Sequence, residues 1–178
     1  MFQRFNADFS ATGDSRYIRS NYQVQQYTPL SKKFTLALNA DFGWGQGVGG
    51  RPYPLFKNYF VGGLGSVRGF QQSTLGPSDS SNSIFLGGAK KIVMNAELLA
   101  PFPGAGSDRT LRLFTFADTG RAFGENEKVS LKELRSSFGV GLSWISPMGP
   151  LRFSYAVPLK RQDTDKIQKL QFQIGTSF

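Results

Sequence analysis

The stretch from Phe34 to Trp44 constrains the fold most, because apolar and small or polar residues alternate in it without a break. A period of two is that of a β-strand with one apolar and one polar face. The apolar positions are Phe34, Leu36, Leu38, Ala40, Phe42 and Trp44. The same period recurs in seven further stretches, at 5–11, 18–25, 94–100, 113–118, 138–144, 151–159 and 170–178. The sequence therefore predicts an all-β chain of eight strands in one domain, residues 1–178.

The contents of the two faces indicate which kind of β-structure this is. A soluble eight-stranded barrel places its apolar side chains inside, but its lumen is only wide enough to be filled by side chains. Here nearly every apolar face carries bulky Phe, Leu, Trp or Tyr, too many to fit, while Gly, Ser, Asn, Gln, Asp and Arg occupy the opposite faces. We therefore expect an antiparallel transmembrane β-barrel with its apolar face against lipid. The expected lipid-facing set includes Leu36, Leu38, Phe42, Val140, Leu142, Phe153, Tyr155 and Phe172.

One strand is ambiguous. In 113–118 the larger side chains, Phe114 and Phe116, share a side with Asp118, so the pattern does not say which of its faces is the apolar one.

One long loop, Gly45–Gly87, interrupts the regular pattern and has no periodicity of its own. Its centre is the glycine-rich stretch Gly62–Pro77, which contains Val67-Arg68-Gly69-Phe70. Long loops without regular structure are usually functional or disordered. Outer-membrane barrels keep short turns in the periplasm and longer loops outside, so we expect this loop on the extracellular side. The charged connections 125–134 and 160–169 belong on the same side, and the former is expected to hold a short helical turn.

The composition excludes several classes of function. The chain contains no cysteine and no histidine, which removes disulfides, thiolate metal sites and the usual general base. We therefore expect no enzyme, no metal and no cofactor. The segment Gly45–Gly50 formally matches a dinucleotide-binding pattern, but the prolines of Arg51-Pro52-Tyr53-Pro54 prevent the helix that this motif requires.

The charge pattern and the absence of long apolar runs limit the partners and the membrane segments that we expect. Net charge is +9, but Lys and Arg fall mostly in the turns, so we expect no nucleic-acid partner. No apolar run reaches the ~18 residues of a membrane helix. The residues after Met1 lack the pattern of a signal peptide, and we interpret the chain as a mature piece of an exported protein.

The central loop motif and the tail resemble a known family. Val67-Arg68-Gly69-Phe70, with Phe60-Val61-Gly62-Gly63 before it and Thr74-Leu75-Gly76-Pro77 after it, resembles the arginine-loop motif of the BamA/TamA-type bacterial surface antigen family. The segments Trp144–Leu151, Phe153–Ala156 and Phe172–Phe178 resemble the tail of the same family. The resemblance covers the whole chain but only the C-terminal half of the family's sixteen-stranded barrel, without the POTRA domains and the first half-barrel.

The resemblance implies a function, a location and a set of residues. Members fold β-barrel proteins and insert them into the bacterial outer membrane without enzymatic chemistry. The implied partners are the outer-membrane lipid bilayer, nascent outer-membrane proteins, and assembly-complex lipoproteins recruited by the POTRA domains. Arg68 is implied to reach into the lumen and pair with Glu97 and Asp118. The implied seam, where substrates engage the last strand, contains Phe172, Ile174, Gly175 and Phe178.

Two questions stay open at this point. The eight strands either close alone as a monomer or pair with a second chain into a larger homodimeric ring. We expect the single-chain barrel, with residues 170–178 paired to 2–11. Because its lumen is full, the loop would be displaced outward and Arg68 separated from its carboxylates. We expect such a fragment to be inactive as an insertase, and the alternative function is a small structural or pore-forming outer-membrane barrel.

Overall fold

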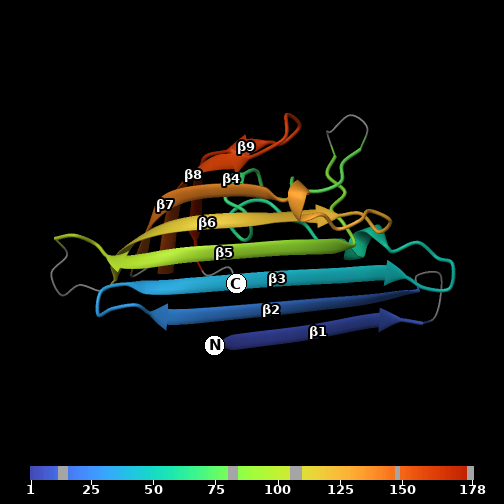
Figure 1. Ribbon diagram of the computed structural model, residues 1–178, viewed down its shortest axis with the longest axis horizontal. Coiled ribbons are helices and arrows are strands. Elements are labelled where there is room, and N and C mark those ends of the chain that lie inside the picture. The colour runs from blue at the N-terminus through green and yellow to red at the C-terminus, as the bar shows by residue number, and fades with distance from the viewer. Residues whose placement is uncertain (12–15, 80–83, 105–109, 147–148, 176–178) are drawn as a thin grey trace.

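The computed structural model describes residues 1–11, 16–79, 84–104, 110–146 and 149–175. Eight antiparallel strands form one sheet in the order β1-β2-β3-β5-β6-β7-β8-β10 (Figure 1). They are β1 Phe2–Ser10, β2 Tyr17–Pro29, β3 Thr35–Gly47, β5 Lys90–Pro101, β6 Leu111–Phe123, β7 Arg135–Ser146, β8 Gly149–Lys160 and β10 Leu170–Ile174. The prediction of an all-β, antiparallel chain with eight strands in one sheet is confirmed.

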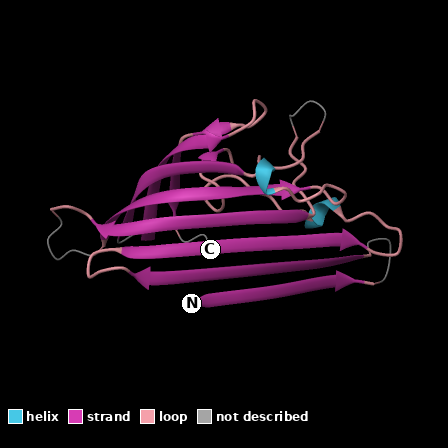
Figure 2. Ribbon diagram, in the orientation of Figure 1, coloured by secondary structure: helices cyan, strands magenta, loops and turns pink. Residues whose placement is uncertain are grey.

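Four short elements complete the described part of the chain (Figure 2). Strands β4 (Gly69–Phe70) and β9 (Ile167–Gln168) pair with each other and lie outside the main sheet. Two single 3₁₀ turns occur, η1 at Leu55–Lys57 and η2 at Leu131–Glu133. The second lies in the charged connection where a helical turn is expected. None of the helical segments in the described ranges is long and apolar enough to cross a membrane.

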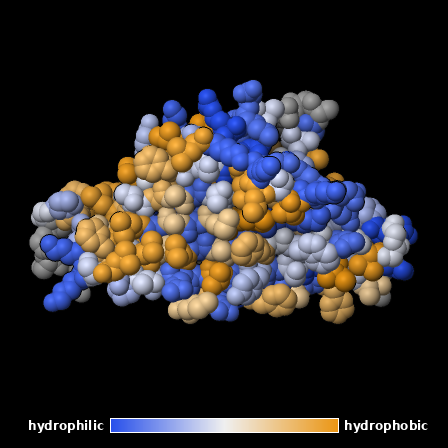
Figure 3. Space-filling view, in the orientation of Figure 1, coloured by the Kyte–Doolittle hydropathy of each residue, from blue (hydrophilic) through white to orange (hydrophobic). Residues whose placement is uncertain are grey.

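The outer face of the sheet carries the large apolar side chains. Directly opposed residues share a face, and the ladder pairs Tyr22 with Phe42 and Val140 with Tyr155. All four side chains are exposed, as are Leu38, Phe153 and Phe172. Several such clusters appear in orange over the strands in Figure 3. An exposed apolar face this broad is unusual in water and fits contact with lipid.

The inner face explains the ambiguous strand. In β6, Phe114, Phe116 and Asp118 are all buried, so the large rings point inward and Leu113, Thr115 and Ala117 point outward. The neighbouring strand β7 makes room for them with glycine. A Cβ at Gly139 would lie 2.6 Å from Phe116 Cζ, and one at Gly141 would lie 2.2 Å from Phe114 Cζ.

The expectation of a closed single-chain barrel is wrong. Within the described residues β1 pairs only with β2, and β10 pairs only with β8, so the sheet is open and no ladder joins the two ends. The sheet is nearly flat at β1–β3 and curves at β6–β8 (Figure 1). The physical reason is the long loop, which occupies the space that a closed lumen of eight strands would need.

The expectation of a displaced loop is wrong for the same reason. Its residues Val61, Val67, Phe70 and Leu75 form a buried cluster against Val93 of β5 and Ala122 of β6. Backbone hydrogen bonds support the packing: Leu75 N donates to Val61 O at 2.8 Å, and Ala122 N donates to Leu75 O at 2.9 Å. The loop therefore lines the inner face of the sheet as part of the core.

Candidate functional site

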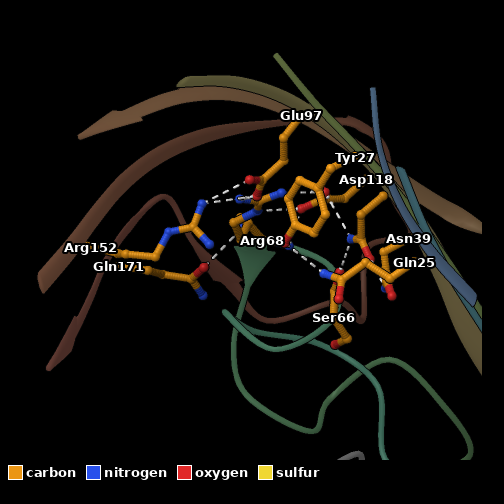
Figure 4. Close-up of polar contacts among 11 residues, drawn as sticks. Gln25, Tyr27, Asn39, Ser66, Arg68, Glu97, Asp118, Arg152 and Gln171 are labelled. Carbon is orange, nitrogen blue, oxygen red and sulfur yellow. Dashed lines mark hydrogen bonds and ion pairs between the residues drawn. The ribbon is translucent and has the colours of Figure 1, made fainter. Parts of the chain in front are cut away.

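Arg68 lies at the centre of the inner face, where only 4% of its surface is exposed (Figure 4). Two features of the sequence place it there. Val67 and Phe70 on either side are fully buried and anchor the motif. Gly69 adopts φ +89°, and a Cβ there would lie 3.0 Å from Ala156 Cβ. Only glycine accepts both this backbone conformation and this approach to the wall.

Both carboxylates of the sequence hypothesis contact the Arg68 guanidinium. Asp118 binds it in a bidentate manner, with Nε to Oδ2 and Nη2 to Oδ1 both at 2.6 Å, and the Arg68 backbone N–H also donates to Oδ2 at 3.0 Å. Glu97 Oε1 accepts from Nη1 at 2.5 Å. A planar guanidinium suits such fork-shaped recognition, which a lysine ammonium does not reproduce. The structure thus brings Arg68, Glu97 and Asp118 together.

Aromatic rings and a second arginine enclose the ion pairs. The Arg68 guanidinium carbon lies 3.6 Å from the centroid of the Phe116 ring. From β8, Arg152 donates to both oxygens of Glu97, at 3.1 and 2.9 Å, and lies 4.4 Å from the Phe114 ring centroid. Two arginines and two carboxylates make the cluster electrically neutral. Among the described ion pairs Asp118 has Arg68 as its cation, so removing Arg68 would leave a buried carboxylate without its partner.

Side-chain amides hold the backbone of the motif. Asn95 of β5 donates to Ser66 O at 2.5 Å and to Asp118 Oδ1 at 2.9 Å. Gln171 of β10 donates through Nε2 to Phe70 O at 2.7 Å. Strands β5 to β8 and β10 therefore all contribute to one site. We call it the motif region: Val67–Phe70 with Glu97, Phe114, Phe116, Asp118, Gly139, Gly141, Arg152 and Gln171.

The predicted seam residues lie apart from this site. Phe172 and Ile174 point outward, and the Phe172 ring stacks on Phe153 of β8 with centroids 4.4 Å apart. Gly175 has φ +87°, and its N–H donates to Pro150 O at 2.8 Å. Phe178 lies outside the described residues.

A second part of the loop docks on β2 and β3 through tyrosines. Tyr59 O–H donates to Ser20 O at 2.7 Å, and Tyr53 O–H donates to Lys57 O at 3.0 Å. Glycines again provide the space, because a Cβ at Gly45 would lie 2.5 Å from the Tyr53 ring. Burial raises the pKa of Tyr53 to about 12, and the hydrogen bond to Asp8 raises the pKa of Lys57. We call Tyr53, Lys57 and Tyr59, with Tyr17, Gly43 and Gly45, the tyrosine region.

Sequence reasoning missed the residues that act across several strands. Asn95, Phe116 and Gln171 were not singled out as site residues, although their polar or ambiguous placement on the alternating pattern was visible. The tyrosine region left even less signal, since Tyr53 and Tyr59 fall in a loop without periodicity.

The fold and the site together define a class: an open β-sheet with a lipid-compatible outer face and an arginine loop docked on its inner face. Comparisons with known proteins agree. The family model described as Omp85 superfamily domain matches residues 1–178. The outer membrane protein assembly factor BamA of Neisseria meningitidis serogroup B is 39% identical over 97% of this chain, which covers 25% of that protein. Sorting and assembly machinery component 50 homolog of Mus musculus is 26% identical over 93% of this chain and 38% of its own length.

A solved structure is similar over most of the chain. The crystal structure of BamA from Haemophilus ducreyi lacking POTRA domains 1-3 matches with a TM-score of 0.79 and 28% identity, covering 89% of this chain and 34% of that one. The chain belongs to the Omp85 superfamily and is an integral outer-membrane protein of that family. It spans about a quarter of the length of the Neisseria relative.

Proposed function

We propose that the chain forms the C-terminal half of the membrane-embedded barrel of an insertase, which folds β-barrel proteins and inserts them into the outer membrane. The proposed activity is non-enzymatic. The relatives named as assembly factors and as a sorting and assembly component support it. The proposed partners are nascent outer-membrane proteins and, for the whole protein, assembly-complex lipoproteins.

The observation that carries the proposal is the similarity along nearly the whole chain to proteins named as assembly factors, with 39% identity over 97% of the chain for the Neisseria relative. We propose that the substrate binds at the terminal strand β10. Where β10 borders the seam of the complete barrel, a nascent β-strand pairs with its backbone and supplies the hydrogen bonds that lipid cannot. The docked loop supports this proposal, because β4 and the motif contact the terminal strand from the inner side through β9 and Gln171.

The alternative of a small pore is less well supported. The loop packs on the inner face of β5 and β6 and buries Val67, Phe70 and Leu75 there, which leaves little lumen for conduction. We propose that the sheet is completed either by preceding strands of a longer chain or by a second copy in a ring. Alone, the 178 residues are expected to be inactive.

The experiment is site-specific photo-crosslinking in lipid vesicles during insertion of an outer-membrane β-barrel substrate. A photoreactive residue at Gln173 of β10, in a polypeptide that contains the complete barrel, is expected to crosslink the substrate. The same probe at Leu38, in the middle of the outer face, is the control and is expected to crosslink lipid alone. Ion conductance without any accelerated insertion would contradict the proposal and favour the pore.

A further inference from the structure

The terminal strand divides into two halves at Lys169. The part after Lys169, β10, pairs with β8 from Leu170 opposite Tyr155 to Ile174 opposite Leu151. The part before Lys169, β9, leaves the main sheet and pairs with β4 of the loop, Gly69 opposite Gln168 and Phe70 opposite Ile167. Figure 1 shows β9 lifted away from the strands of the main sheet. The last wall contact at the division is the hydrogen bond from Ala156 N to Lys169 O, at 2.8 Å.

Pro158 explains why the strand leaves the wall there. In an antiparallel strand, N–H groups point alternately to the two neighbours, and the N–H of Ala156 points to the last strand. The next residue on that side is Pro158, which has no N–H to donate. The ladder between β8 and the last strand therefore cannot continue regularly. Residues 167–168 find their backbone partners in the motif instead.

Gln171 extends this pairing with its side chain. Its carboxamide is buried, donating through Nε2 to Phe70 O at 2.7 Å and accepting from Gly69 N at 3.4 Å (Figure 4). Just before the start of β9, Gln71 N donates to Lys166 O at 2.8 Å and continues the same pairing. The motif is thus joined to the terminal strand along residues 166–171, through backbone and side chain together.

We propose that Gln171 is a positioning residue that couples the arginine motif to the terminal strand, so that docking of Arg68 determines how firmly β10 is held in the wall. Arg68 binds Glu97 of β5 and Asp118 of β6, so its effect on β10 travels through Gly69 and Phe70. Coupling between two sites is reciprocal in free energy. Loss of Gln171 therefore loosens the motif as loss of Arg68 loosens β10. This inference concerns the fold of the chain and does not need the proposed insertion activity.

Amide hydrogen exchange of the 178-residue chain in lipid vesicles tests the coupling. The variants are Arg68→Ala, Gln171→Ala, the double variant, and Gln173→Ala as the control on the same face of β10. Exchange within 35–47 of β3 serves as the internal measure of folding. Gln171→Ala is expected to accelerate exchange in both 59–71 and 166–174 by about fivefold, the value of a typical hydrogen bond. Gln173→Ala is expected to leave 59–71 unchanged.

The decisive readout is exchange of 166–174 in Arg68→Ala, because it reports an effect on residues outside the arginine's own ion pairs. We expect acceleration there, and no further acceleration in the double variant. Unchanged exchange at 166–174, with faster exchange confined to 59–71, would overturn the proposal. Multiplying effects in the double variant would also overturn it, since independent sites add their free energies.

Gln171→Glu distinguishes a specific coupling from general loosening. An ionised carboxylate accepts from Gly69 N but cannot donate to Phe70 O, whereas a protonated carboxyl does both. Exchange of 59–71, taken as a ratio to the unmutated chain at each pH, is expected to be fast at neutral pH and to recover as the carboxyl is protonated. A ratio that does not change with pH would contradict the role of the side-chain donor.

Discussion

The loop packs on the inner face of the sheet at two places. Both accommodate aromatic rings against glycines, but we expect them to differ in rigidity. In both, glycines of the wall make room for rings: Gly139 and Gly141 in the motif region, Gly43 and Gly45 in the tyrosine region. The motif region then adds charge and excludes water, with Asp118 only 2% exposed. The tyrosine region has hydroxyls that donate to backbone carbonyls, and its ion pair, Lys57 with Asp8 of β1, is partly exposed. Fully paired buried charges specify one arrangement, whereas rings resting on glycine tolerate small displacements.

The largest effect is expected from Arg68→Ala. It leaves Asp118 buried without its bidentate partner, and breaking a buried ion pair costs about 3–5 kcal/mol. Urea unfolding in lipid vesicles, followed by tryptophan fluorescence, measures the loss. The exposed Arg161→Ala is the charge-matched control and is expected to change the free energy of unfolding little. Equal losses in the two variants would show that the motif region contributes no special stability.

A matched pair of glycine substitutions compares the walls of the two regions. A Cβ at Gly139 would lie 2.1 Å from Tyr155 O as well as 2.6 Å from the Phe116 ring, and a strand backbone cannot give way. The three atoms nearest to a Cβ at Gly45 all belong to the Tyr53 side chain, which can shift more readily than a strand backbone. Gly139→Ala is therefore expected to cost about 1–3 kcal/mol, and Gly45→Ala less, in the same unfolding measurement. The reverse order would mean that the tyrosine region is the more rigid of the two.

Arg152→Ala tests how much the second arginine of the motif region contributes to stability. Glu97 keeps Arg68, and Arg152 is already one-third exposed, so the loss is expected to be about 1 kcal/mol. Arg152→Lys keeps the positive charge and is expected to lose less. A loss as large as that of Arg68→Ala would show that the two arginines act as one unit.

Alkaline pH is expected to act locally, in the tyrosine region. Because the pKa of Tyr53 is raised to about 12, the folded chain holds this proton more tightly than the unfolded chain does. The resulting stability is complete below the unfolded value of about 10 and is lost as pH rises through about 12. The raised pKa of Lys57 acts in the same direction. A dye on a single cysteine at Leu55 is expected to report opening in this range.

Tyr53→Phe is the control for the alkaline transition. It removes the titrating hydroxyl and keeps the ring on Gly45, so it is expected to weaken the transition. The chain has no cysteine of its own, which makes the label at Leu55 unique. An unchanged transition in Tyr53→Phe would assign it to another group.

What the sequence by itself determined is local and periodic. The alternation in stretches such as 34–44 and 138–144 predicted the strands and their outward faces, because side-chain direction in a strand depends only on position along it. The resemblance of the motif paired Arg68 with Glu97 and Asp118 before any geometry was known. The resemblance did this because the residues that flank Glu97 and Asp118 also match the family's pattern.

The tertiary structure alone decided where the loop lies, whether the sheet closes, and which distant residues meet. Arg152 reaches Glu97 across β6 and β7, and Gln171 reaches Phe70 from the end of the chain. No period or spacing encodes such contacts, since they depend on how the sheet curves around its contents. The sheet stays open for the same reason, contrary to the expectation from lumen volume. That expectation counted the strand side chains alone as filling, whereas Val67, Phe70 and Leu75 of the loop are also buried against the inner face.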